Sequence, residues 1–184
     1  MLRSTFPLLN FHRDCDINII INVVEALSNV LLFYLETVKV DRPISTAIYF
    51  FLSSGNVSNL HRIPSAETWH FYLGEPITIL EINDIYGSVK FTCMGQDILK
   101  SQRLQYTVPP DVWFGAFPTR DYDILVDNRV VKKAPRDTGK HFSLVGTTVA
   151  PAFESNDFVL AKCSQLISRF PALESLVSMF TPSD

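Results

Sequence analysis

The chain has 184 residues, of which 47% are hydrophobic and 19% are charged. This composition is typical of a globular protein, and the length is enough for one domain with a substantial core. The net charge of −3 provides no basic field for a phosphate backbone, so we expect no nucleic-acid partner. The three cysteines, Cys15, Cys93 and Cys163, are far apart and form no C-x-x-C pair. Their spacing argues against a disulfide scaffold and favours a reducing, cytoplasmic location.

An apolar stretch dominates the N-terminal region, where residues 17–35 read INIIINVVEALSNVLLFYL. Four polar residues recur in it at the spacing of one helical face: Asn18, Asn22, Glu25 and Asn29. We therefore expect residues 1–32 to form an apolar helical segment. A helix packed on the rest of the protein is the favoured interpretation, and a membrane-associated or targeting segment and an atypical N-terminus are the alternatives. Polar residues along one face make a membrane span costly, so we expect no membrane partner.

From Ser45 onward, short runs rich in β-branched and aromatic residues alternate with Gly, Pro, Asn and Asp. Seven such runs read STAIYFFLSS, TWHFYLG, PITILEI, SVKFTCMG, LQYTVP, VWFGAF and FSLVGTTVAP. Residues 83–87, NDIYG, predict a hairpin turn between two of them. Several short, evenly spaced strands indicate a β-sandwich or a closed β-barrel, which we expect from about Ser45 to Pro151.

Two later segments depart from this strand pattern. Residues 117–141 are polar and charged, and we expect a solvated insertion that contains a small hairpin. Acidic residues interleave with the basic ones there, which disfavours a nucleic-acid patch. Residues 162–170, KCSQLISRF, predict a short amphipathic helix that Pro171 ends. We expect residues 172–184 to be a C-terminal tail.

Residues that could carry chemistry gather in residues 55–74, which read GNVSNLHRIPSAETWHFYLG. His61 ends one predicted strand and Glu67 opens the next, so the two side chains have the same parity across a turn and can face the same interior. Trp69 shares the face of Glu67, whereas His70 takes the other face. A histidine and a carboxylate in one pocket can act as a general base and its orienting partner, or as two metal ligands.

The spacing of this segment resembles the first cupin motif, G-x5-H-x-H-x3/4-E-x6-G. His61 and Glu67 occupy two ligand positions, but Ile63 replaces the second histidine. The second motif, G-x5-P-x-G-x2-H, is best matched by residues 109–114, PPDVWF, with Phe114 at the histidine position. Two of the four ligand positions are therefore apolar, and two protein ligands are a thin base for zinc, iron or manganese. We expect no bound metal and no other cofactor.

Further segments extend the resemblance, namely STAIYF from Ser45, ETWHF from Glu67, WF at residues 113–114 and LVGTTVAPAFESNDF at residues 144–158. Together they resemble the "cupin five" domain of unknown function among the RmlC-like cupins, over about residues 33–171. The resemblance implies an all-β cupin double-stranded β-helix, or jelly roll, and we expect the N- and C-terminal helices predicted above to flank it. It also implies a homodimer and an interior pocket for an unassigned small-molecule ligand.

The resemblance leaves three functions open. By analogy of fold with RmlC-like epimerases, a metal-independent epimerase or isomerase would use His61 as base and Glu67 to orient it. Its acid would be one of three tyrosines: Tyr49, Tyr72 or Tyr106. A non-catalytic module would instead bind a sugar- or nucleotide-like ligand in the same pocket, and metal-dependent cupin chemistry is the third possibility. The other candidate ligand-binding residues are polar and aromatic side chains near the motifs: Tyr49, Arg62, Trp69, His70, Trp113 and Phe114.

Overall fold

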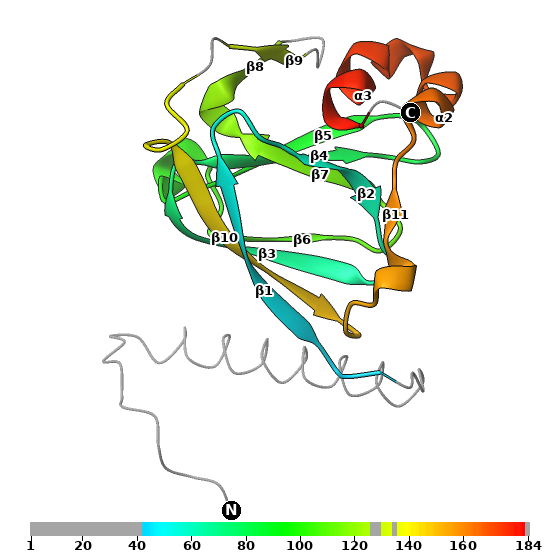
Figure 1. Cartoon of the computed structure of the whole chain (residues 1–184), viewed down its shortest axis with the longest axis horizontal. Helices are drawn as coiled ribbons and strands as arrows, with labels where there is room; N and C mark the ends of the chain where they lie inside the picture. The colour runs from blue at the N-terminus through cyan, green and yellow to red at the C-terminus, as the bar shows by residue number, and fades with distance from the viewer. Residues whose placement is uncertain (1–41, 126–129, 134–135, 183–184) are drawn as a thin grey trace, which may run out of the picture. The chain divides into compact units, whose positions relative to one another are not determined.

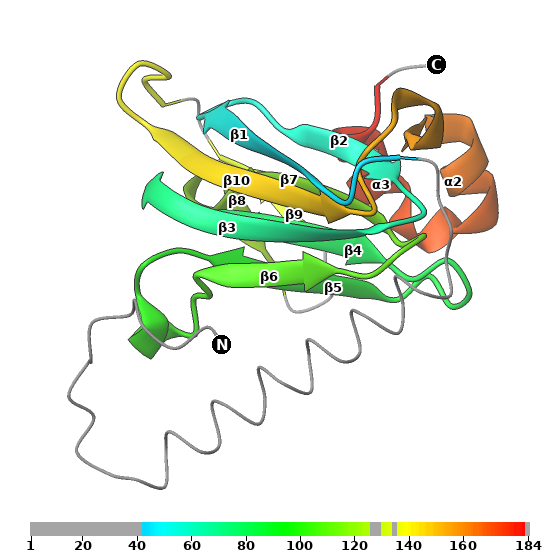
Figure 2. The ribbon, with the colours of Figure 1, turned by 90° about the horizontal axis from the view of Figure 1, so that it is seen from below.

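The computed structural model describes residues 42–125, 130–133 and 136–182, and within them two antiparallel β-sheets lie face to face (Figure 1). The first sheet has the strand order β1 (Thr46–Ser53), β10 (Phe142–Ala150), β3 (Ala66–Gly74) and β6 (Gln105–Val108). The second has the order β11 (Val159–Leu160), β2 (Ser58–Arg62), β7 (Trp113–Pro118), β4 (Ile77–Ile82) and β5 (Val89–Met94). Figure 2 shows the four strands of the first sheet side by side.

The predicted all-β class is confirmed in this two-sheet form, and each of the seven predicted runs overlaps a strand. The first sheet follows the alternation expected of strands with one covered face. In β3, for example, Glu67, Trp69 and Phe71 are buried, whereas the residues between them are more exposed. The helix that we predicted in residues 1–32 lies outside the described residues.

The second sheet is a middle layer with apolar clusters on both of its faces. In β4, Ile77 and Ile79 belong to the cluster between the two sheets. Leu80 and Ile82 belong to a second cluster, which the C-terminal helices complete. All six residues of β4 are buried, because a strand that is covered on both faces needs no polar alternation.

Short helices follow the last strand, on the side of the second sheet that faces away from the first (Figure 1). They are α2 (Cys163–Arg169) and α3 (Glu174–Phe180), joined by the 3₁₀ turn η4 (Pro171–Leu173). The remaining short elements are β8 (Tyr122–Ile124), β9 (Val130–Lys132), η1 (Ile98–Lys100), η2 (Thr119–Asp121) and η3 (Ser155–Asp157). No helix within the described ranges is long and apolar enough to cross a membrane.

The predicted helix at residues 162–170 is confirmed by α2, but the expected tail from residue 172 is wrong, because α3 forms there. In α3, Leu176, Val177 and Phe180 lie on one face and are buried in the second cluster, between the second sheet and the helices, which we call the helix-side cluster. We predicted a tail because Pro171 ends α2. Proline is, however, also well suited to the first turn of the helical segment that follows.

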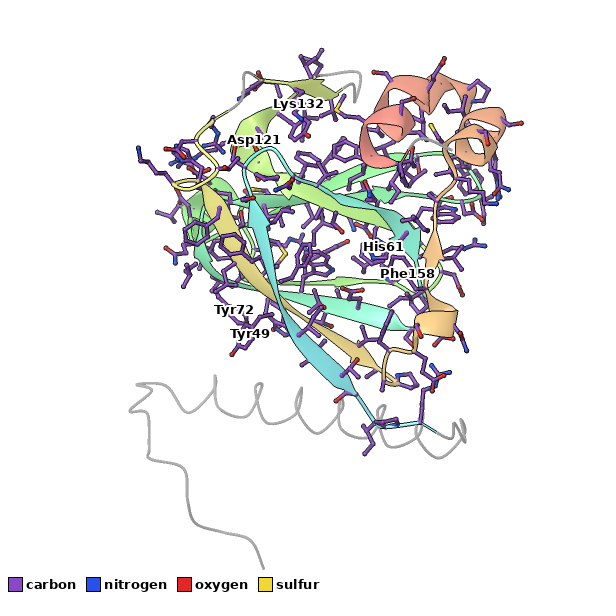
Figure 3. All side chains as sticks on the ribbon, in the orientation of Figure 1. Tyr49, His61, Tyr72, Asp121, Lys132 and Phe158 are labelled. Atoms are coloured by element: carbon purple, nitrogen blue, oxygen red, sulfur yellow. The ribbon has the colours of Figure 1, made fainter. Side chains whose placement is uncertain are left out.

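The region of residues 117–141 contains the predicted hairpin, formed by β8 and β9, but it is more than a solvated insertion. Asp121, labelled in Figure 3, is buried and accepts hydrogen bonds from Ser54 Oγ at 2.8 Å and Arg136 Nε at 2.7 Å. Arg136 also pairs with Glu75 at 2.7 Å. These ion pairs tie the insertion to the turns at the ends of β1 and β3, since an isolated buried carboxylate would be costly.

Candidate functional site

A cavity of about 490 Å³ lies between the two sheets, within the size range of small-molecule sites. Its apolar lining comes from both sheets and from the segment after β10: Ile48, Phe50, Ile63, Trp69, Val149, Phe153, Phe158 and Leu160. Its polar lining is smaller: Thr46, Ser58, Asn59, His61, Glu67 and Thr147. An apolar chamber with a few polar groups is the usual form of a ligand pocket.

His61 and Glu67 both line this cavity, so the placement predicted from their parity is confirmed. In β2, Leu60 faces the helix-side cluster, which turns the next residue, His61, towards the space between the sheets. Glu67 is the second residue of β3 and lies on the same inner face as Trp69. His61 and Glu67 are each only 8% exposed.

The His61 ring is held in one tautomer. Its Nδ1 lies 2.7 Å from the backbone oxygen of Asn59. Because a carbonyl oxygen can only accept, Nδ1 carries the proton, and Nε2 of the neutral ring is an acceptor that has no hydrogen-bond partner among the described residues. The ring stacks on Phe158 at 4.9 Å and 25°, and Figure 3 shows the two side chains close together. Burial lowers the pKa of His61, opposed by the Asn59 hydrogen bond, so the imidazole is neutral near pH 7.

Glu67 is a carboxyl group with an altered proton affinity. Burial raises its pKa from 4.5 to about 7, while a hydrogen bond from the Thr147 hydroxyl acts in the opposite direction. About half of the Glu67 side chains therefore carry a proton near neutral pH. The cavity thus holds a neutral histidine, His61, that can accept a proton and a carboxyl group, Glu67, that in its protonated half can donate one.

The four positions that resemble cupin metal ligands do come together, but they do not form a metal site. Ile63 lines the cavity with His61 and Glu67, and Phe114 packs against the His61 ring at 4.2 Å. Two hydrocarbon side chains leave only one nitrogen and one carboxylate as donors, fewer than a transition metal needs from a protein. In the part of the chain that the structure describes, no three His, Cys, Asp or Glu residues are placed to hold a metal ion.

Arg62, Trp113 and Phe114 do not line the cavity, contrary to our expectation. The Arg62 guanidinium lies over the Trp113 ring at 4.6 Å, and Trp113 Nε1 donates to Asp84 at 3.1 Å. Trp113 belongs to the helix-side cluster, whereas its neighbour Phe114 belongs to the cluster between the sheets. The expectation failed because β7 is buried on both faces, so the sequence pattern predicts an interior position for both Trp113 and Phe114.

Other expected site residues lie on the outer face of the first sheet. His70 contacts the Thr148 hydroxyl at 3.1 Å and does not line the cavity. Tyr49 and Tyr72 pack together at 5.6 Å, and Figure 3 shows them away from His61. Tyr106 is buried between the sheets, but its hydroxyl donates to Glu81 at 2.6 Å and it does not line the cavity.

One part of the lining, residues 153–160, did not stand out in the sequence. This segment follows β10 and supplies Phe153, Phe158 and Leu160 to the cavity. Arg42 holds it through ion pairs with Asp157 and with Glu154. Its two phenylalanines fall within LVGTTVAPAFESNDF, but a loop has no periodicity that would predict which side chains face a pocket.

Residues 23–161 match the model of the Cupin_5 family, described as "Cupin superfamily (DUF985)". Protein SO0799 from Shewanella oneidensis is 27% identical with a TM-score of 0.65, over 79% of this chain and 80% of that one. A hypothetical protein from Leishmania major is 26% identical with a TM-score of 0.60, over 75% and 76%. No curated protein matches the chain.

A dTDP sugar isomerase from Desulfovibrio desulfuricans G20 is more distant, at 13% identity and a TM-score of 0.48, over 67% of this chain and 71% of that one. A likeness of this degree carries no argument about activity.

Proposed function

Because the chain belongs to the Cupin_5 family of the cupin superfamily, we propose that it binds a small organic ligand in the cavity between its sheets. The two sheets would then be the halves of the jelly roll, or double-stranded β-helix, that the sequence resembles. One observation carries the proposal: a cavity of about 490 Å³ with apolar walls holds two buried titratable side chains, His61 and Glu67. Titratable groups with shifted pKa values in a pocket are typical of functional sites.

The cost of burying these two groups supports a functional role. A carboxyl group held away from water is destabilising when it ionises, and apolar residues of similar size would fill the same space without that cost. Ile63 occupies a neighbouring position in the lining and illustrates such a residue. A ligand that hydrogen-bonds to Glu67 and His61 would compensate for the unfavourable burial.

A thermal-shift screen of metabolites and nucleotide sugars, followed by titration of each hit, tests this proposal. We expect a hit to raise the melting temperature of the wild-type protein, and its affinity to fall in the variants Glu67→Gln and His61→Gln. The control is His70→Gln, because His70 lies on the outer face of the same sheet. Hits that bind all three variants as tightly as the wild type would show that the ligand site lies elsewhere.

Proton transfer to and from a bound ligand is the second candidate function. It is favoured by the pairing of a free Nε2 acceptor on His61 with a Glu67 carboxyl group whose pKa is about 7. Since the expected acids Tyr49, Tyr72 and Tyr106 do not line the cavity, Glu67 is the group that would donate the proton. Exchange of a ligand C–H for deuterium in D₂O, lost in His61→Gln, would support this chemistry over simple binding.

We further propose that this function needs no metal, because Ile63 and Phe114 stand at two of the four cupin ligand positions. Protein purified without chelators should contain far less than one equivalent of iron, manganese, nickel or zinc by elemental analysis. A near-stoichiometric content of any of these metals would contradict the proposal.

A further inference from the structure

An unpaired hydrogen-bond donor belongs to the wall of the cavity. Trp69 lines the cavity and is 2% exposed, and its indole Nε1 is buried without an acceptor among the described residues. The ring itself is fixed, because it packs edge-on against Phe50 at 5.9 Å and against Phe114 at 6.4 Å. A buried N–H that lacks a partner costs about 1–3 kcal/mol, so such a group needs an explanation.

The lining of the cavity also lacks positive charge. Lysine and arginine are absent from the described residues that line it. Arg42, which holds the segment of residues 153–160, is paired with Asp157 and Glu154. Arg62 lies over Trp113 outside the cavity. A phosphate or carboxylate in the cavity would therefore lose its hydration without gaining a cation, and it would lie near Glu67.

The remaining walls are aromatic and aliphatic. Phe50 comes from β1, while Phe153 and Phe158 come from the segment after β10. Phe158 and the His61 ring stack, which gives the cavity a flat surface on the side of the second sheet. Flat hydrophobic walls of this kind favour a ring system over a flexible chain, because a rigid ligand loses less conformational entropy on binding.

We propose that the ligand is an uncharged, ring-bearing molecule with a carbonyl or ether oxygen that accepts a hydrogen bond from Trp69 Nε1, and that nucleotides and sugar phosphates are excluded. This inference rests on the proposed function of the cavity and narrows it. Both polar groups fit such a ligand, since His61 Nε2 accepts a hydrogen bond from a hydroxyl group and Glu67 in its acid form donates one.

The two tryptophans of the chain, Trp69 and Trp113, allow a direct test by NMR, because ¹⁵N-labelled protein gives one indole signal for each. The variant Trp113→Phe assigns the two signals. The probes are matched pairs of neutral one- and two-ring lactones, ketones and quinones with their carboxylates, beginning with coumarin and coumarin-3-carboxylate. Thymidine diphosphate is the nucleotide probe.

We expect neutral members of the panel to move the Trp69 indole proton downfield in a saturable way. The Trp113 signal should stay in place, because its N–H is already bonded to Asp84 outside the cavity. Each carboxylate should bind at least about tenfold more weakly than its neutral partner, and thymidine diphosphate should leave the Trp69 signal unchanged.

Three results would overturn the inference. Anionic probes that move the Trp69 signal at equal or lower concentration would refute the neutral class, while the cavity would still be a ligand site. Neutral ligands that perturb other cavity residues but not the Trp69 indole proton would refute the hydrogen bond. If no probe, neutral or charged, perturbs any cavity residue, then the proposed function fails together with this inference.

Discussion

At the scale of single residues, the most unusual property of the molecule is a pair of buried titratable groups, of which His61 is neutral and Glu67 is about half protonated near pH 7. Burial is the largest influence on the pKa of each, and it lowers that of His61 and raises that of Glu67. The directions are opposite because burial always disfavours the charged form, which is the protonated form of a histidine and the deprotonated form of a glutamate. Neither group has an ionic partner among the described residues, so their proton affinities depend on the cavity itself.

The raised pKa of Glu67 predicts how stability depends on pH. The folded state, with a pKa of about 7, binds this proton more tightly than the unfolded state, with a pKa near 4.5. The stabilisation is therefore fully present below about pH 4.5 and is lost as the pH rises through about 7. At about 1.4 kcal/mol per pKa unit, the loss between pH 5 and pH 8 is on the order of 2–3 kcal/mol.

Urea denaturation of the wild type and of Glu67→Gln at pH 5, 6, 7 and 8 measures this loss. The amide of glutamine does not titrate, so the stability of the variant relative to the wild type should rise steadily with pH. The contribution of His61 is common to both proteins and cancels to first order. A stability difference that stays constant from pH 5 to pH 8 would show that the pKa of Glu67 is not raised.

At the scale of elements, the position of His61 depends on a close approach between two strands. A Cβ atom on Gly115 in β7 would lie 2.6 Å from the backbone oxygen of Ser58 in β2. The β2–β7 register is also irregular between Ser58 and His61. Glycine at position 115 therefore lets the backbone of β2 come close enough for its side chains to reach the cavity.

We predict that Gly115→Ala lowers the free energy of unfolding by about 1–3 kcal/mol, because backbone atoms must move to admit the methyl group. Gly146→Ala is the matched control. The three atoms nearest to its Cβ would all belong to the ring end of Tyr72, with the hydroxyl at 2.3 Å, and that side chain is 44% exposed and can rotate away. Chemical denaturation of both variants should show the larger loss for Gly115→Ala. Equal losses would mean that the β2–β7 approach is not tight.

At the scale of the whole molecule, an exposed aromatic patch and a sheet edge occur together. The patch lies on the outer face of the first sheet and consists of the exposed residues Tyr49, Phe51 and Tyr72 together with the half-buried Phe142, which stacks on Phe51. Strand β1 carries two of these residues and forms the edge of the four-stranded sheet. Edge strands and exposed apolar patches both favour association, which agrees with the homodimer that the family resemblance implies and that we propose here.

The homodimer proposal predicts different effects for two equally exposed tyrosines. Tyr49 in β1 is 80% exposed and Tyr86 in the β4–β5 turn is 81% exposed. Tyr49→Lys should raise the dimer dissociation constant at least about tenfold, a loss of about 1.4 kcal/mol, whereas Tyr86→Lys should not change it. Sedimentation equilibrium at micromolar concentration measures both. A wild-type protein that sediments only as a monomer would refute the proposal.

The sequence by itself was sufficient for most of the strands and for the inward placement of His61 and Glu67 in the candidate site. Strand alternation and turn residues act over a few positions, so they can be read locally. The spacing in residues 55–74 likewise predicted that His61 and Glu67 face the same interior, and in the structure they do so from opposite sheets, His61 from β2 and Glu67 from β3. The same spacing showed that Ile63 takes the place of a metal ligand.

Only the tertiary structure decided which aromatic residues reach the cavity. Trp113 and Phe114 are adjacent and both buried, yet neither lines the cavity: Trp113 packs on the helix side of β7, and Phe114 packs between the sheets against the His61 ring. Phe158 comes to the His61 ring from almost a hundred positions further along the chain, through a loop that has no periodic pattern. Contacts between segments so distant in sequence depend on how the sheets pair, and local spacing does not contain that information.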